Sequence, residues 1–313
     1  MRILLLCALL FSRMPAIGQL ERFNYEGDNP GELSFFRYVP PAALNNPDAP
    51  LVIVLHGCGQ DARQINALAG WTTLADELGL LLLFPEQKKL NNMGDCFNWF
   101  LANDVEPFGG EMHSIYVATQ AFRREYSGTR NYVYGVSAGA AMALAMLYNY
   151  PDFFRAGAVL AGGAFKYHDS MLSAATYLQQ SNTYPAEIML GFLPERIRRY
   201  SGPFPSLVSI HGTSDPVVHV AHQEGLRKQY LAWTRSETAE EEASAPRDGI
   251  RRRQFSLNEA KTAQLVLFTL EGMGHAVPVD HSQPERKGGS GLFAASVDWF
   301  STRAILIEWG LTR

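Results

Sequence analysis

The segment YVYGVSAGAAMA, residues 132–143, joins a strand-like run to an apolar helical run that continues to residue 149. Ser137 stands at the junction, flanked by Gly135 and Gly139 in the pattern G-x-S-x-G. A turn from strand to serine to helix exposes the serine oxygen on a strained backbone, which requires small neighbours. The pattern therefore predicts a nucleophilic Ser137, although a serine that only packs between strand and helix would look similar.

Short apolar runs alternate with helical patterns on both sides of this segment. Alternation of this kind predicts βαβ units, hence a mainly parallel sheet with helices on both faces. The predicted strands cover residues 51–55, 80–84, 132–136, 156–163, 207–212 and 264–272, and the predicted helices cover 61–78, 111–126, 138–149 and 292–305.

Composition favours a soluble globular protein, and the lack of a repeat or of a Pro/Ser/Thr-rich linker predicts a single domain over residues 19–313. The chain has 313 residues, of which 47% are hydrophobic and 19% charged, and its net charge is −4. Residues 164–205 carry few strand signals, so a helical excursion is expected there, and the charged residues 235–254 predict a surface loop. Arg251–Arg253 is a short basic run, interpreted as a solvated turn, so nucleic-acid binding is not expected.

The first 18 residues have the pattern of a secretory signal peptide. Arg2 precedes the apolar run ILLLCALLF at 3–11, and small residues follow at Ala16 and Gly18. The apolar run is shorter than the about 20 residues that span a bilayer, so stable membrane insertion is not expected. The prediction is an extracellular protein; the alternative is an apolar N-terminus on a cytoplasmic one.

Removal of that segment would take away Cys7 and leave Cys58 and Cys96 of the three cysteines. In an oxidising compartment such a pair can form a disulfide, and two separate buried thiols are the alternative. His219 and His222 lie three residues apart without a matching third ligand. Neither a metal site nor a cofactor is therefore predicted.

Polar residues follow several of the predicted strands, where ligands gather in open α/β sheets. The turn HGCG, residues 56–59, follows the apolar run LVIVL, and its glycines leave backbone N–H groups accessible. The N–H groups of Cys58 and of Ala138, just after the serine, could together form an oxyanion hole. His56 itself is expected to be a buried structural histidine.

Two further strand ends carry Asp215, in HGTSDPVV, and His275, in GMGHAVP. A carboxylate can orient a histidine and stabilise its imidazolium form, and a histidine can deprotonate a serine. The order Ser137, Asp215, His275 is that of triads in α/β-hydrolases. Alternatively, the aspartate belongs to an ordinary turn and the histidine to the surface.

The motifs together resemble the esterase/polyhydroxybutyrate-depolymerase family, which includes bacterial feruloyl and acetylxylan esterases. The resemblance covers residues 33 to 302 and implies an α/β-hydrolase fold with Ser137 as nucleophile, His275 as base and Asp215 as its orienter. It also implies a Cys58–Cys96 disulfide, the Cys58 backbone as an oxyanion donor, and Trp99 as a wall of the substrate pocket, for which core packing is the alternative. The motifs that carry it are LHGCGQ at 55–60, Gly70–Trp71, PEQ at 85–87, CFNWF at 96–100, GVSAG at 135–139, HGTSD at 211–215 and GMGH at 272–275.

The resemblance leaves the ester itself open. Phe97 stands where a second tryptophan is common, and Val277 where an aromatic residue often precedes the proline. Polymer-degrading members of the family usually carry a linker and a polymer-binding domain after the catalytic one; neither is expected here, so small or oligomeric esters are expected rather than solid polyester. The expected function is a secreted carboxylic-ester hydrolase acting on hydroxyalkanoate esters or oligomers without an obligate protein partner. The alternatives are a feruloyl or acetylxylan esterase, a peptidase of the same fold, and a non-catalytic binding protein.

Overall fold

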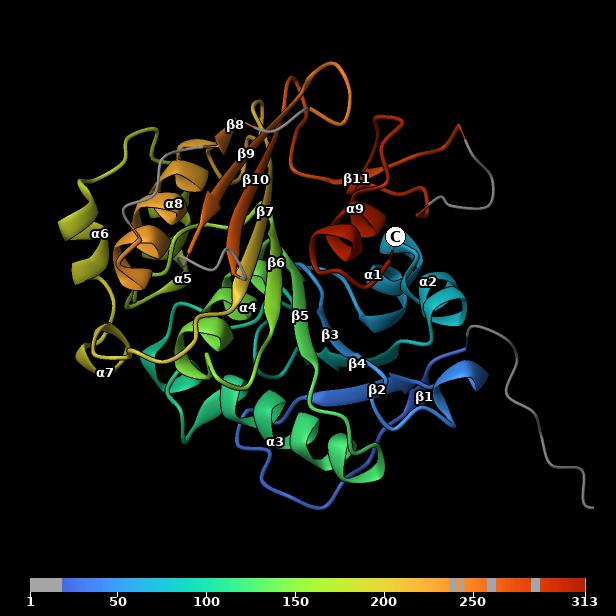
Figure 1. Ribbon diagram of the computed structural model, residues 1–313. Coiled ribbons are helices and arrows are strands. Elements are labelled where there is room, and N and C mark those ends of the chain that lie inside the picture. Colours follow the sequence, from blue (N-terminus) through green and yellow to red (C-terminus); the bar gives the residue numbers. More distant parts are fainter. Residues whose placement is uncertain (1–18, 237–240, 243–244, 258–262, 283–287, 313) are drawn as a thin grey trace, which may run out of the picture.

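A ten-stranded sheet organises this computed structural model, which describes residues 19–236, 241–242, 245–257, 263–282 and 288–312 (Figure 1). The predicted signal peptide, residues 1–18, lies outside the described residues. Neighbouring strands from β4 to β10 pair in parallel, and the strands beyond them on each side pair antiparallel. In spatial order the strands are β1 (Glu21–Arg22), β2 (Ser34–Tyr38), β4 (Leu81–Glu86), β3 (Leu51–Leu55), β5 (Asn131–Val136), β6 (Ala156–Leu160), β7 (Ser206–Gly212), β10 (Gln264–Leu270), β9 (Ile250–Ser256) and β8 (Glu241–Glu242).

Helices cover both faces of the sheet, as the sequence predicts. Side chains of β3 alternate between two hydrophobic clusters, because successive residues of a strand point to opposite faces. The first cluster includes α3, α4 and α8, and the second includes α1, α2 and α9. The helices are α1 (Ala62–Ala69), α2 (Trp71–Leu78), α3 (Gly110–Glu125), α4 (Ala138–Asn149), α5 (Met171–Leu178), α6 (Ala186–Gly191), α7 (Glu195–Arg198), α8 (Ala221–Thr234) and α9 (Ser301–Glu308), with 3-10 turns at Pro41–Ala43 and Ala102–Asp104.

Two predicted helices differ from the structure. The helix expected over residues 61–78 is broken at Gly70, whose φ of 68° ends α1 and begins α2. The closing helix expected over 292–305 begins only at Ser301. Residues Ala294–Ser296 instead form β12, which pairs with β11 (Val277–Val279) in a small second sheet.

Two predicted boundaries of strand and loop were also wrong. β4 continues through Pro85 to Glu86, which is possible because β3 pairs with β4 only as far as Leu83 and leaves the proline without a ladder partner there. The basic run Arg251–Arg253 is not a turn. It lies within β9 and pairs with β10, so the expected loop 235–254 includes the first residues of a strand.

The segment 164–205 contains the short helices α5, α6 and α7, which pack against α8 (Figure 1). Two buried side chains of α8 hold this segment. The Gln229 amide donates to the backbone oxygens of Phe165 and Met189 at 2.9 and 2.8 Å, and the Trp233 indole N–H donates to that of Ile197 at 2.8 Å. Helices this short depend on tertiary contacts of this kind for their stability.

Candidate active site

Ser137 lies in a sharp turn between β5 and α4. Its φ of 55° and ψ of −120° are unusual for a residue with a side chain, so the surrounding structure must hold the turn in place. The Ser137 N–H donates to the Leu160 oxygen on the neighbouring β6 at 2.9 Å, and α4 begins at the next residue. The serine hydroxyl is thereby presented at the carboxyl edge of the sheet.

The two glycines of the motif allow this turn to approach its neighbours closely. A Cβ atom at Gly135 would lie 2.1 Å from the Gly139 oxygen, and one at Gly139 would lie 2.4 Å from the His56 oxygen. Such distances are far below van der Waals contact, so each glycine is required for steric reasons. Gly135 lets β5 approach the start of α4 closely, and Gly139 lets α4 approach the end of β3 closely.

A continuous hydrogen-bonded chain joins the three residues that the sequence singles out. His275 Nε2 lies 2.9 Å from Ser137 Oγ, and His275 Nδ1 lies 2.8 Å from Asp215 Oδ2. Asp215 follows β7, and His275 follows β10. These neighbouring strands are parallel, so their carboxyl ends bring the two loops to the same edge as Ser137. The imidazole can therefore exchange a proton with the serine while the carboxylate orients it.

The Asp215 carboxylate is held by four groups. Its Oδ1 accepts hydrogen bonds from the N–H groups of Val217 and Val218 at 2.8 and 2.9 Å, and its Oδ2 also lies 3.5 Å from His211 Nε2. Burial raises the pKa of Asp215, but the contacts with His211, His275 and the Val218 N–H outweigh it, so the pKa is well below its ordinary value. Asp215 is accordingly ionised at neutral pH.

The turn at residues 56–59 lies against Ser137. A Cβ atom at Gly57 would lie 3.4 Å from Ser137 Cβ. His56 is fully buried, with its Nδ1 2.8 Å from the Gly57 oxygen and its Nε2 accepting from the Gln87 N–H at 3.1 Å, and burial lowers its pKa. Within the described residues, the N–H groups of Cys58 and Ala138 donate no hydrogen bond. Both therefore remain available to an acceptor, and their role as oxyanion donors stays a prediction.

A disulfide joins Cys58 to Cys96, the pairing that the family resemblance implied. A backbone hydrogen bond from Gly59 to Gly94, 2.8 Å long, runs beside it. The Gln87 amide donates to the Cys96 oxygen at 3.0 Å. The turn next to Ser137 is thus tied covalently and by hydrogen bonds to the segment that carries the aromatic motif.

The segment that carries the aromatic motif contacts Glu111, a buried carboxyl group that the sequence analysis missed. It accepts hydrogen bonds from the Asn98 N–H and side-chain amide at 2.7 and 2.8 Å, and from the Gln87 amide at 2.5 Å. Burial, reinforced by Asp104, raises its pKa to about 8. Its position could have signalled burial, because Glu111 lies four residues before Ile115, on the apolar face of α3.

Trp99 is 6% exposed and belongs to the hydrophobic core. Its ring lies edge-on to Phe100 and to His168, with centroids 5.7 and 6.1 Å apart. These contacts fit the core-packing alternative, and a role as pocket wall stays a prediction.

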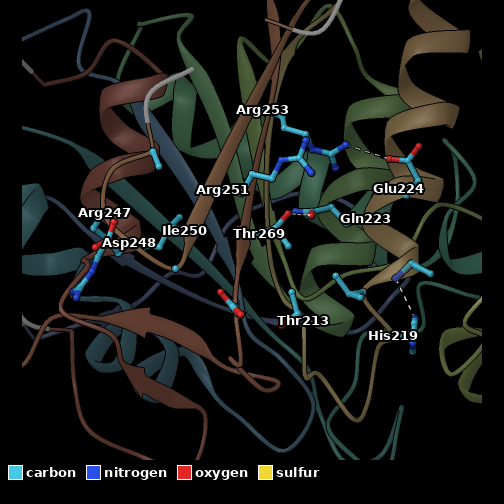
Figure 2. Close-up of a pocket in the computed structure, with 15 residues that line it drawn as sticks. Thr213, His219, Gln223, Glu224, Arg247, Asp248, Ile250, Arg251, Arg253 and Thr269 are labelled. Atoms are coloured by element: carbon cyan, nitrogen blue, oxygen red, sulfur yellow. Dashed lines mark hydrogen bonds and ion pairs between the residues drawn. The ribbon is translucent and has the colours of Figure 1, made fainter. Parts of the chain in front are cut away.

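Two clefts lie near the hydrogen-bonded chain. One of about 370 Å³ is lined by Gly59 of the 56–59 turn and by Phe293, whose ring lies 6.4 Å from that of His275. A larger cleft of about 910 Å³ lies between β9, β10 and α8 (Figure 2). In this larger cleft Arg253 pairs with Glu224 at 3.5 Å, and Arg247 pairs with Asp298 at 3.4 Å.

Within the described ranges, no helix combines the length and the apolar character needed to cross a bilayer. Nor do three or more histidine, cysteine, aspartate or glutamate side chains in these ranges gather where they could hold a metal ion.

Comparisons with known proteins identify the relatives of this chain. It is 32% identical to poly(3-hydroxyalkanoate) depolymerase C of Paucimonas lemoignei over 88% of this chain and 65% of that protein. It is 28% identical to feruloyl esterase B of Thermothelomyces thermophilus over 84% of this chain and 90% of that protein. An acetyl xylan esterase from Aspergillus awamori superposes with a TM-score of 0.74 at 19% identity, covering 94% of this chain and all of that one.

The structural likeness confirms the predicted α/β-hydrolase fold. The names of the relatives agree on carboxylic-ester hydrolysis, the class of reaction that the sequence predicts. The model of the esterase PHB depolymerase family matches residues 33–254, which include Ser137 and Asp215. This chain therefore belongs to the esterase PHB depolymerase family of carboxylic-ester hydrolases.

Proposed function

We propose that this protein is a secreted serine esterase in which Ser137, His275 and Asp215 form the catalytic triad. The observation that carries the proposal is the chain of hydrogen bonds from Ser137 Oγ through His275 to Asp215. It is supported by the strained turn at Ser137 and by the ionised state of Asp215.

In the first half of the reaction, Ser137 Oγ attacks the ester carbonyl carbon and its proton passes to His275 Nε2. Asp215 stabilises the resulting imidazolium through His275 Nδ1. The N–H groups of Cys58 and Ala138 hold the negative oxygen of the tetrahedral intermediate. His275 then protonates the leaving alcohol, which leaves the acyl group on Ser137.

In the second half, water attacks the acyl carbon while His275 Nε2 takes its proton. Collapse of the second tetrahedral intermediate returns that proton to Ser137 and releases the acid. No step requires a cofactor or a metal ion.

The substrate class we propose is a hydroxyalkanoate ester or oligomer, supported by the similarity to a poly(3-hydroxyalkanoate) depolymerase. Feruloyl or acetylated polysaccharide esters are the second candidate, supported by the similarity to a feruloyl esterase that extends over 90% of that relative. Secretion and a single catalytic domain over residues 19–313 belong to the same proposal. The N-terminal pattern of residues 1–18 and the Cys58–Cys96 disulfide support secretion.

The test is hydrolysis of p-nitrophenyl butyrate by wild type and by Ser137→Ala. The Ser137→Ala variant should lose at least about 10⁴-fold in kcat while it stays folded, because no other group can form the acyl-enzyme. Ser214→Ala, which alters an exposed serine near Asp215, is the matched control and should keep its activity. Full activity in Ser137→Ala would end the assignment. Comparing hydroxybutyrate oligomers, methyl ferulate and acetylated xylan then ranks the two substrate classes.

A further inference from the structure

A third pocket, of about 360 Å³, lies between α5 and the chain that leaves β6, and its lining includes Lys166, His168 and Gln180. It adjoins the segment that carries Trp99. The backbone N–H of His168 donates to the backbone oxygen of Phe100 at 2.8 Å. The His168 ring lies edge-on to Trp99, with the ring centroids 6.1 Å apart. Its volume is within the roughly 300–1,000 Å³ typical of small-molecule sites.

Two polar atoms of this pocket are buried without a hydrogen-bond partner among the described residues. They are Nε2 of His168 and Oε1 of Gln180. His168 is 9% exposed, so bulk water does not solvate its ring freely. Leaving such an atom unpaired costs about 1–3 kcal/mol, which a bound molecule with matching polar groups would recover.

Lys166 supplies a positive charge to the same pocket. Its ammonium lies 4.9 Å from the centres of both the Tyr177 and the Phe192 rings, and it forms no ion pair with any residue that the structure describes. The larger cleft in Figure 2 differs in this respect, because Arg253 there is paired with Glu224. The Lys166 ammonium is thus held by aromatic faces and remains open to an anion.

His168 adds a neutral donor beside this cation. Burial, and after it the positive charge of Lys166, lower the pKa of His168 to about 4, although the nearby Asp169 opposes this. The ring is therefore uncharged at neutral pH. Its Nδ1 lies 3.2 Å from Ser173 Oγ. When the Ser173 hydroxyl donates to Nδ1, the ring proton is on Nε2, which then needs an acceptor.

We propose that this pocket binds a short hydroxy acid, such as the end unit of a hydroxyalkanoate chain or the acid that its hydrolysis releases. The carboxylate would accept hydrogen bonds from Lys166 Nζ and His168 Nε2, and the hydroxyl would donate to Gln180 Oε1. The Tyr177 ring, which also lines the pocket, gives the alkyl part an apolar surface. The choice of a hydroxy acid rests on the proposed hydroxyalkanoate substrate, whereas the need for one anion and one hydroxyl rests on the pocket alone.

The experiment measures binding by calorimetry in the Ser137→Ala variant, which keeps ester ligands intact. The probes are 3-hydroxybutyrate, its methyl ester and butyrate. We expect saturable binding of 3-hydroxybutyrate with a Kd of roughly 1 mM, as suits a ligand of this size. The methyl ester, which has no charge, and butyrate, which has no hydroxyl, should each bind about tenfold more weakly.

Further substitutions test the carboxylate-binding group and the hydroxyl-binding group of the pocket separately. Lys166→Met should weaken 3-hydroxybutyrate binding about tenfold and Lys166→Arg should restore part of it, whereas Gln180→Ala should abolish the preference over butyrate. Lys89→Met, on an exposed lysine outside the pocket, is the matched control, and thermal unfolding checks that each variant is folded. Equal binding of acid and methyl ester, or equal binding by the Lys166→Met and Lys89→Met variants, would overturn the proposal. Because the readout is binding, it is independent of whether wild type hydrolyses p-nitrophenyl butyrate.

Discussion

Asp215 and Glu111 are two buried carboxyl groups whose charge states differ. Asp215 is 7% exposed and Glu111 is 1% exposed, and each accepts several hydrogen bonds. Yet the pKa of Asp215 is held well below its usual range, whereas the pKa of Glu111 is raised to about 8. Asp215 faces two histidines, one of which can become an imidazolium, whereas Glu111 faces neutral amides and the like-charged Asp104.

The number of hydrogen bonds therefore does not by itself set the charge of a buried group. Deep burial and the charges of the neighbours decide it. Asp215 is thereby prepared to stabilise a positive charge on His275. Glu111 instead acts as an uncharged tie at neutral pH, connecting α3 to the disulfide segment through Asn98 and Gln87.

The largest expected effect comes from removing the charge of Asp215. Asp215→Asn should lower kcat for p-nitrophenyl butyrate by about 10⁴-fold with little change in KM, because an amide can neither hold the required tautomer of His275 nor stabilise its imidazolium. Steady-state kinetics measures this. Asp28→Asn, on an exposed loop, is the control. A loss below tenfold would show that Asp215 does not act through His275.

The next effect is on stability. Glu111→Ala should lower the free energy of unfolding by about 3 kcal/mol, because it leaves the amides of Asn98 and Gln87 buried without their acceptor. Urea denaturation measures this, and Glu187→Ala, on an exposed position of α6, serves as the control. If both variants unfold at the same urea concentration, the tie between α3 and the disulfide segment contributes nothing.

The effect that is smallest per pH unit is a pair of opposite pH dependences of stability. The raised pKa of Glu111 stabilises the fold fully below its unfolded value near 4.5, and this contribution declines as pH rises towards 8. The lowered pKa of Asp215 stabilises the fold above about 3.8, and this contribution is lost as pH falls further. Each slope is at most about 1.4 kcal/mol per pH unit.

These slopes are checked by urea denaturation across the pH range. Glu111→Gln should flatten the decline between pH 4.5 and 8, and Asp215→Asn should flatten the loss below pH 3.8. Parallel profiles for wild type and Glu111→Gln would mean that Glu111 is ionised in the folded protein after all.

Much of the fold was predictable because each parallel strand is a continuous apolar run. The alternation of strand and helix and the α/β-hydrolase fold were confirmed. The wrong predictions came from a glycine that ends a helix and from a strand pairing. Gly70 breaks a helix that its apolar spacing would continue, and the basic run Arg251–Arg253 forms a strand because β10 offers it a ladder partner. Tertiary pairing of that kind leaves little trace in local composition.

The part of the site that lies in recognisable motifs was predictable from the sequence. Ser137, Asp215 and His275 follow strands, and their hydrogen-bonded chain agrees with the predicted order, although their catalytic roles stay a proposal. Glu111 was missed because its partners Gln87 and Asn98 lie 24 and 13 residues away, on other segments. The contact of His211 with Asp215, four residues apart, was missed because the sequence alone does not show that the turn after β7 brings these two side chains together. No spacing rule relates Glu111 to Asn98, and the four-residue spacing of His211 and Asp215 predicts a contact within a helix, not at the end of a strand.

The close backbone contacts at Gly135 and Gly139 also bear on how this enzyme can change during evolution. A single added carbon at either position would collide with main-chain atoms, which cannot move aside as a side chain can. Selection should therefore keep the turn around Ser137 constant. The pocket at Lys166 is lined by side chains of α5 and of the chain on either side of it, and it can accept substitutions one at a time. New substrate preferences can thus arise in residues 164–205 while the chemistry stays as it is.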